Sequence, residues 1–175
     1  ETVYKGKLEK LKSYGEPSGI ANPIAKIGLP FGLNNFELLP FWTAFLRKLG
    51  FETVLSDVST RDMYMQGQHS IPSDTVCYPA KLMHGHIENL LEKGVDAIFY
   101  PCMTYNLDEE RATNHYNCPV VAYYPELLKA NVSALADFDF MMPYFELADK
   151  KRFTKHAVKY FCRKYPQIKK KQAIA

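Results

Sequence analysis

Three cysteines, Cys77, Cys102 and Cys118, stand in the part of the chain that is richest in reactive side chains. In a reducing compartment such thiols bind metal, take part in redox chemistry or pack as small hydrophobic groups. Three thiolates that meet at one point suit an iron–sulfur cluster with one iron free, or a zinc ion with a fourth ligand. The intervals of 24 and then 15 residues match no compact ferredoxin or zinc-finger pattern, so plain burial of each thiol stays open.

Two of these cysteines are expected at the same edge of a sheet. Cys77 precedes a helix whose first turn tolerates Pro79, and the exposed amides and positive dipole of a helix N-terminus favour a thiolate. Cys102 follows an apolar strand, residues 95–100, through Pro101. Ligands bind outside the carboxyl ends of strands in open α/β sheets, where the N-termini of crossover helices also lie. Cys77 and Cys102 are therefore predicted to converge.

The other candidate ligands are harder to place. Cys118 precedes an expected strand, residues 120–124, which puts it at the opposite edge unless the loop of residues 104–117 bends back. His115 stands three residues before Cys118, a spacing that can chelate but is common by chance. His84 and His86 are two apart on a helix and so form a poor bidentate pair. Cys162 lies among aromatic residues and is expected to be a packing residue.

Alternating apolar segments predict the elements that position these residues. Strands are expected at residues 24–29, 51–55, 95–100 and 120–124, with an edge strand at 138–142. Helices are expected at residues 38–49, 60–67, 79–93 and 126–131, and Gly50 and Gly94 close two of them. Strands separated by helices imply a three-layer α/β fold of the Rossmann-like type, a mainly parallel sheet with helices on both faces.

Length and composition limit the class of protein. The chain has 175 residues, 47% of them hydrophobic, which suits one globular domain and excludes collagen-like, disordered and disulfide-scaffold classes. No apolar run is long enough for a membrane span or a signal peptide, so we expect a cytoplasmic protein without a membrane partner. The chain lacks the glycine-rich phosphate-binding loops of nucleotide enzymes. It starts at Glu1 without Met, which suggests a piece of a longer protein.

Charge and breaker residues suggest three segments. Residues 1–23 are rich in Gly and Pro and are expected to form a linker or arm, residues 24–148 the α/β domain, and residues 149–175 a basic amphipathic helix and tail. The last 26 residues hold ten of the 22 basic residues and no acidic one. Phe153, Ala157, Phe161 and Tyr165 recur there every four residues, as in a helix that docks one face. We therefore expect a docking surface for phosphate or an acidic partner rather than a nucleic-acid site.

Three runs of sequence carry a family resemblance. They are PFWTAFLRKLGFETVLSD at residues 40–57, SIPSDTVCYPAKLMHGHIENLLEKGVDAIFYPC at 70–102, and NHYNCPVVAYYPELLK at 114–129. Together they resemble the uncharacterised domain attached to CoA-substrate-specific enzyme activases, which is similar to the subunits of 2-hydroxyacyl-CoA dehydratases. The resemblance spans roughly residues 24–145. It implies a long bacterial parent chain with an ATP-dependent activase module of the actin-like type, which this piece lacks.

The dehydratase relatives hold a [4Fe–4S] cluster by three cysteines per subunit and use one electron, injected by an ATP-driven activase, to remove water from a CoA thioester. Carried over by position, the resemblance implies Cys77, Cys102 and Cys118 as cluster ligands. Lys81, His84 and His115 are expected to donate hydrogen bonds that tune the reduction potential.

The expected function is that of an electron-transfer module that works with the activase module or with a dehydratase-like subunit. The isolated piece has no assigned catalytic residue and is expected to be inactive. Two alternatives remain: a metal-free docking or scaffolding domain, and a CoA- or small-molecule-binding domain whose basic tail attracts phosphates.

Overall fold

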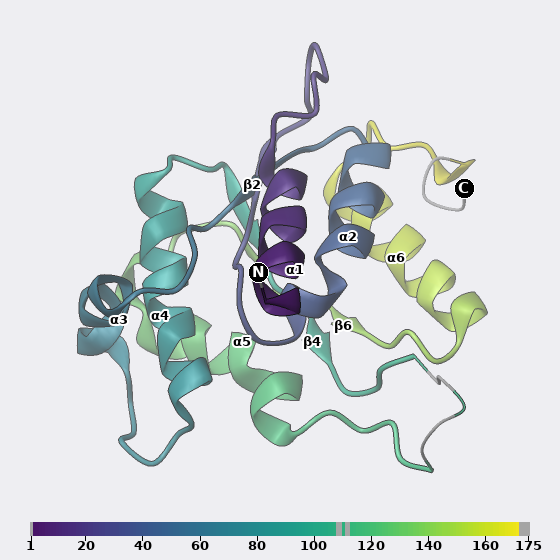
Figure 1. Cartoon of the computed structure of the whole chain (residues 1–175). Coiled ribbons are helices and arrows are strands. Elements are labelled where there is room, and N and C mark those ends of the chain that lie inside the picture. Colours follow the sequence, from purple (N-terminus) through teal and green to yellow (C-terminus); the bar gives the residue numbers. More distant parts are fainter. Residues whose placement is uncertain (1, 108–109, 111–112, 172–175) are drawn as a thin grey trace.

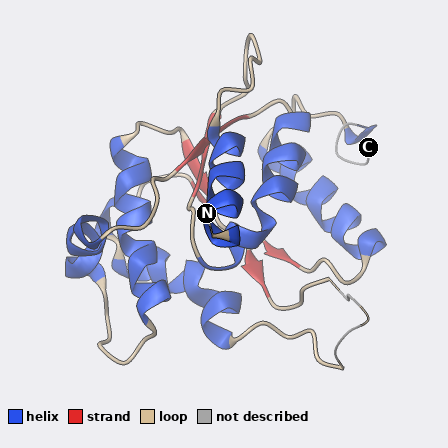
Figure 2. Ribbon diagram, in the orientation of Figure 1, coloured by secondary structure: helices blue, strands red, loops and turns tan. Residues whose placement is uncertain are grey.

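A four-stranded parallel sheet forms the centre of the computed structural model, which describes residues 2–107, 110 and 113–171. The strand order is β2-β1-β3-β5, with β1 at Lys26–Leu29, β2 at Glu52–Leu55, β3 at Ala97–Phe99 and β5 at Phe140–Met141. Figures 1 and 2 show the strands in the middle of the molecule, among the helices. Ile27 of β1 pairs with Thr53 on one side and with Ala97 on the other. The described helices are α1 (Val3–Lys12), α2 (Leu33–Lys48), α3 (Arg61–Gly67), α4 (Tyr78–Glu92), α5 (Pro119–Asn131) and α6 (Lys150–Lys164).

Two short strands continue the sheet beyond its carboxyl edge. β4 (Cys102–Met103) follows β3, β6 (Tyr144–Phe145) follows β5, and the two pair in parallel. The Tyr100 amide donates to the Met141 carbonyl, and the Cys102 amide donates to the Pro143 carbonyl, both at 2.9 Å. These hydrogen bonds extend the parallel pairing of β3 with β5 to the following strands, β4 and β6. Cys102 is thereby fixed opposite Tyr144.

Helices cover both faces of the sheet, because side chains alternate along each strand. Ala97 and Phe99 of β3 belong to one buried cluster, together with the inner sides of α2 and α6. Ile98 and Tyr100 belong to the other, together with α4 and α5. The architecture is therefore the expected three-layer α/β fold with a Rossmann-like parallel sheet.

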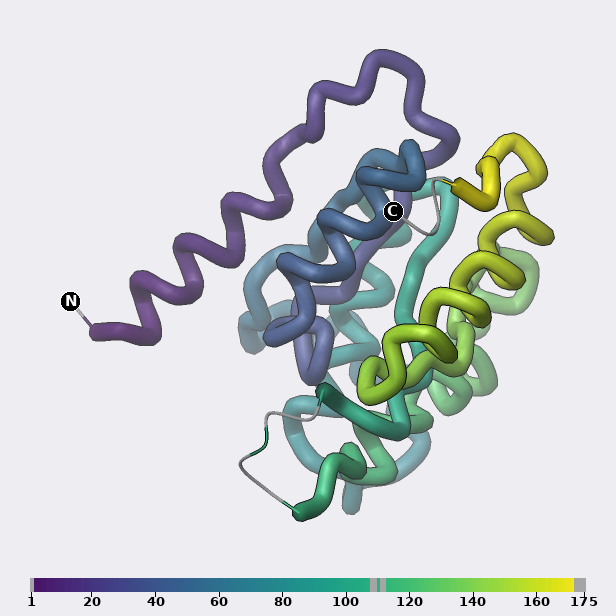
Figure 3. The backbone as a smooth tube through the Cα atoms, turned by 90° about the vertical axis from the view of Figure 1, so that its right-hand side faces the viewer, coloured from purple at the N-terminus to yellow at the C-terminus, as the bar shows by residue number. Residues whose placement is uncertain are grey.

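The first 23 residues, predicted as a linker or arm, carry α1 and a short 3-10 turn at Ser13–Gly15. α1 is mostly exposed, with only Leu11 buried, and Lys7 pairs with Glu37 of α2 at 2.7 Å. Figure 3 shows α1, in purple, running outward to the N-terminus at the margin of the molecule. α1 thus rests on α2 without taking part in the sheet.

The predicted strand at residues 120–124 is wrong, since these residues lie inside α5. Two valines and two tyrosines are typical of a strand, and Pro125 suggested that a helix starts only after them. Val120, Tyr124 and Leu128 instead face the second buried cluster, a spacing of four that suits a helix. Pro125 is a buried interior residue of that helix, so it did not mark a boundary.

The helix predicted at residues 38–49 begins earlier than expected, at Leu33, and includes Pro40 in its interior. The other predicted elements overlap observed ones, including the edge strand and the basic helix α6, whereas α1, β4 and β6 were not predicted. No helix within the described ranges is both long and apolar enough to cross a membrane.

Candidate functional site: a cysteine-bearing edge of the sheet

Three cysteines lie at the carboxyl edge of the sheet, each on a different element. Cys102 opens β4 directly after β3, and Cys77 and Cys118 are the N-cap residues of α4 and α5. Both helices lead into strands of a parallel sheet, so their N-termini lie at the carboxyl ends of those strands. In Figure 1, α4 and α5 both begin in the lower part of the molecule. Each helix has a proline in its first turn, Pro79 and Pro119, where the missing N–H costs nothing.

The loop between β4 and α5 returns Cys118 to the strand that carries Cys102. The Asn117 amide donates to the Thr104 carbonyl at 2.9 Å, and Asn117 Nδ2 donates to the Met103 carbonyl at 2.8 Å. Two hydrogen bonds therefore hold Asn117 next to Met103 and Thr104, the residues that follow Cys102. This overturns the placement of Cys118 at the opposite edge, because that placement depended on the incorrect strand at residues 120–124.

Tyr124 connects the N-terminal parts of α4 and α5. Its hydroxyl lies 3.0 Å from His84 Nε2, and His84 Nδ1 lies 2.7 Å from Ser70 Oγ. Burial raises the pKa of Tyr124 to about 12, and the nearby charge of Cys77 adds to the shift. A chain of buried polar groups thus ties Ser70, α4 and α5 together behind Cys77.

Cys102 differs from the other two cysteines in its burial. Its thiol is fully enclosed, whereas Cys77 and Cys118 are exposed. Burial raises the pKa of the Cys102 thiol to about 12, and the Glu126 carboxylate raises it further, while a hydrogen bond with Tyr144 lowers it. Tyr144 also donates a hydrogen bond to Glu126. At neutral pH, Cys102 is therefore a protonated thiol.

The three residues expected to support a cluster are engaged in different ways. Lys81 Nζ donates to the Asp74 carbonyl at 2.8 Å and so holds the loop before α4. His84 is buried in the Ser70–Tyr124 chain, where it positions α5 against α4. His115 lies in the loop before Cys118, and its carbonyl accepts from the Asn106 amide at 3.1 Å.

Sequence reasoning missed three side chains of this edge: Tyr124, Glu126 and Tyr144. Two of them lie on α5, and the correct helix from residue 119 would have placed both within two turns of Cys118. Tyr144 lies next to Cys102 because β6 pairs with β4, and no local sequence pattern indicates that pairing.

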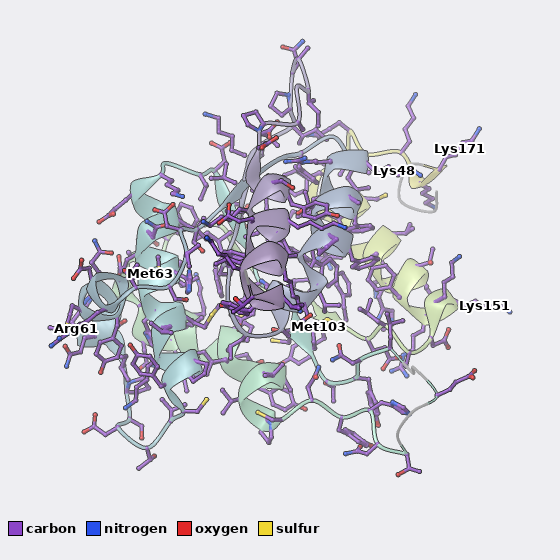
Figure 4. All side chains as sticks on the ribbon, viewed as in Figure 1. Lys48, Arg61, Met63, Met103, Lys151 and Lys171 are labelled. Carbon is purple, nitrogen blue, oxygen red and sulfur yellow. The ribbon has the colours of Figure 1, made fainter. Side chains whose placement is uncertain are left out.

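A close crossing of two helices fixes the segment that carries Cys77. A Cβ added at Gly85 of α4 would lie 2.0 Å from the Met63 carbonyl oxygen of α3, and one at Gly67 would lie 2.2 Å from the Gly85 amide nitrogen. Figure 4 labels Met63 at this crossing. The two glycines let the backbones meet, and the chain then passes through Ser70 to Cys77.

A single-ion site lacks its ligands in the part of the chain that the structure describes. No group of three or more His, Cys, Asp or Glu side chains there can hold one metal ion. The zinc alternative needs ligands about 2.0 to 2.3 Å from one centre, so it does not fit this arrangement. A cubane cluster binds each cysteine through a different iron, which requires a wider spacing of the sulfurs.

One comparison with known proteins identifies a family. The family model described as CoA enzyme activase uncharacterised domain matches residues 26–175. The matched region contains all the described strands, the three cysteines of the edge and the basic helix α6. No curated protein and no solved structure matches the chain.

Proposed function

We propose that this chain, which belongs to the family of the CoA enzyme activase uncharacterised domain, is an electron-transfer module of such an activase system. In this proposal Cys77, Cys102 and Cys118 hold a [4Fe–4S] cluster, which passes one electron at a time when bound. The observation that supports the proposal is that three cysteines, from three separate elements, lie at the same edge of the sheet.

The two exposed cysteines suit an anionic group. Cys77 and Cys118 each cap a helix of 13 residues or more, whose first backbone amides have no partner within the helix. Those amides and the helix dipoles favour negative charge at both caps. A cluster with thiolate ligands carries such charge, so α4 and α5 would stabilise it from two sides.

Cys102 has to lose its proton to serve as a ligand, because the thiolate is the form that binds metal. Its pKa, raised by burial to about 12, favours the thiol. The hydrogen bond with Tyr144 lowers the pKa of Cys102, but Tyr144 has one hydroxyl proton, which it donates to Glu126, so it would stabilise the thiolate by turning that proton to the sulfur. The proposal therefore assigns Tyr144 a positioning role at Cys102, in which its hydroxyl proton turns from Glu126 to the sulfur when the thiol loses its own proton.

Exposure of the Cys77 and Cys118 side of the edge supports exchange with a partner. In the proposal that partner is the ATP-dependent activase module of a parent chain or a dehydratase-like subunit. Electron transfer then requires that the partner approach the N-terminal ends of α4 and α5.

Anaerobic reconstitution with ferrous iron and sulfide tests the ligand set. We expect about four irons per chain in the wild type, with broad absorption near about 400 nm. Cys77→Ser and Cys118→Ser change exposed caps and should each lower the iron content at least twofold while leaving the circular dichroism spectrum unchanged. Cys102→Ser should act in the same way, with its folding checked by thermal melting because the residue is buried.

Cys162→Ser is the matched control, because Cys162 lies on α6 and packs against the first buried cluster. It should keep the iron content of the wild type. Wild-type iron in all three edge variants would refute the ligand assignment. A wild type that takes up no iron would favour the alternative of a metal-free docking domain.

A further inference from the structure

A groove between β6 and α6 contains none of the proposed cluster ligands, although its lining shares Tyr144 with the cysteine-bearing edge. Its volume is about 570 Å³, within the roughly 300 to 1,000 Å³ typical of small-ligand sites. One wall is the β6 segment, and the other is α6. The lining residues used below are Tyr144, Phe145, Lys159, Tyr160, Arg163 and Lys164.

The α6 wall is a single stripe of the helix. Tyr160, Arg163 and Lys164 follow one another at spacings of three and four, which places them on one side. The neighbouring stripe, with Ala157 and Phe161, is buried in the first cluster. The basic side chains that line the groove are therefore held by a helix whose adjacent face is anchored in the core.

The groove carries positive charge that the protein does not neutralise. Lys164 pairs with Asp139 at 2.8 Å. Lys159 and Arg163 are exposed, and neither has an acidic partner in the part of the chain that the structure describes. Glu146, next to the β6 wall, is paired with Arg152 at 2.9 Å. Two cations thus remain for an anionic ligand.

Three of the other lining residues are uncharged aromatic side chains. Phe145 is buried, Tyr160 is half-buried, and Tyr144 exposes 53% of its surface. Burial raises the pKa of Tyr160 far above its usual range, so its ring brings no negative charge to the groove. Aromatic walls beside two free cations suit a ligand that has both a planar ring and phosphate groups.

We propose that this groove binds a nucleoside phosphate, with the phosphates on Lys159 and Arg163 and the base against Tyr144 and Tyr160. The proposal goes beyond the electron-transfer function and does not depend on the cluster. An isolated anion would use only the cations, and the aromatic residues would then contribute nothing to affinity.

Isothermal titration calorimetry of the whole chain at physiological salt tests the site, with ADP, adenosine 3′,5′-bisphosphate and tripolyphosphate as probes. We expect one nucleotide per chain, and the tighter of the two nucleotides identifies the phosphate arrangement. Tripolyphosphate should bind at least tenfold more weakly than the better nucleotide, because it has no ring.

Variants separate the two halves of the groove. Lys159→Gln and Arg163→Gln should each weaken nucleotide binding about tenfold, and Tyr144→Leu should weaken nucleotide but not tripolyphosphate binding. Lys151→Gln is the matched control, since Lys151 is exposed near the start of α6, away from the groove lining (Figure 4). No saturable nucleotide binding, equal affinity for tripolyphosphate, or an equal loss in Lys151→Gln would overturn the proposal. None of these readouts involves iron, so such a result would leave the cluster proposal standing.

Discussion

At Cys102 a single thiol is enclosed by protein, and its environment controls any chemistry that it performs. Burial and the Glu126 carboxylate raise its pKa to about 12. If Cys102 is a cluster ligand, its proton must leave during loading. The rate of iron uptake should therefore rise between pH 7 and pH 9. Because removal of a negative charge eases formation of a thiolate, Glu126→Gln should speed uptake at pH 7.

Iron uptake followed by absorbance under anaerobic conditions checks this prediction. Glu92→Gln serves as a control, because Glu92 is exposed at the other end of α4. An uptake rate that does not change with pH, or that Glu126→Gln slows, would count against proton release from Cys102.

Two buried histidines should make the fold sensitive to mild acid. Burial lowers the pKa values of His84 and His86 to about 4, from 6.5 in a solvated histidine. The folded state thus binds fewer protons than the unfolded state. Their contribution is complete above pH 6.5 and is lost as the pH falls towards 4, by at most about 3 kcal/mol per histidine.

Urea denaturation at pH 7.5, 6 and 5 measures this loss. His86 bonds to the hydroxyls of Ser56 and Ser59 at 2.7 and 2.9 Å, so His86→Gln keeps polar groups available while removing the titration. We expect the variant to lose about half as much stability between pH 7.5 and pH 5 as the wild type. If the free energy of unfolding changes with pH equally in the variant and the wild type, His86 does not contribute to the acid sensitivity.

At the scale of elements, the α3–α4 crossing determines how the segment before Cys77 is held. A methyl group at Gly85 would meet the backbone of α3 at 2.0 Å, which no side-chain rotation can relieve. Gly85→Ala should therefore destabilise the protein by about 3 kcal/mol, at the upper end of overpacking costs. Gly6→Ala in exposed α1 meets nothing within 4 Å and should be neutral or slightly stabilising. Thermal melting of both variants compares them, and equal melting temperatures would disprove the tight crossing.

The sheet strands were predictable, since runs such as residues 95–100 are apolar and end at proline or glycine. The helical state of residues 120–124 was not predictable, because two valines and two tyrosines suit both a strand and the buried face of a helix. The choice is made by packing of Tyr124 and Leu128 against the second cluster. The early start of α2 at Leu33 was equally hidden, because its N-cap is Gly32, which has no capping side chain.

At the scale of the whole molecule, α6 packs onto the same core as α2 and the sheet. Phe161 is fully buried, with its ring 5.5 Å from that of Phe45 and 6.0 Å from that of Phe99. Phe161→Ala should cost about 3 to 5 kcal/mol of unfolding free energy. Lys155→Ala, on the exposed side of α6, should change it by less than about 0.5 kcal/mol. Denaturant titration measures both, and a small effect of Phe161→Ala would show that α6 is only loosely attached.

The position of each cysteine was predictable where the neighbouring strand or helix was identified correctly. The common edge of Cys77 and Cys102 followed from the rule that crossover helices begin at the carboxyl ends of parallel strands. Cys118 was misplaced because its neighbouring element was misidentified. The Ser70–His84–Tyr124 chain joins residues up to 54 positions apart, and such long-range contacts leave no periodic signal in the sequence.

Electron paramagnetic resonance of the anaerobically reconstituted chain, reduced with dithionite and recorded at low temperature, tests the central claim most directly. A [4Fe–4S] cluster accepts one electron, so the account predicts a fast-relaxing signal that integrates to about one spin per four irons. The signal should persist in Cys162→Ser and vanish in Cys118→Ser. A reduced wild type without the signal, or a Cys118→Ser variant with the full signal, would contradict the assignment of the cysteine-bearing edge as a cluster site.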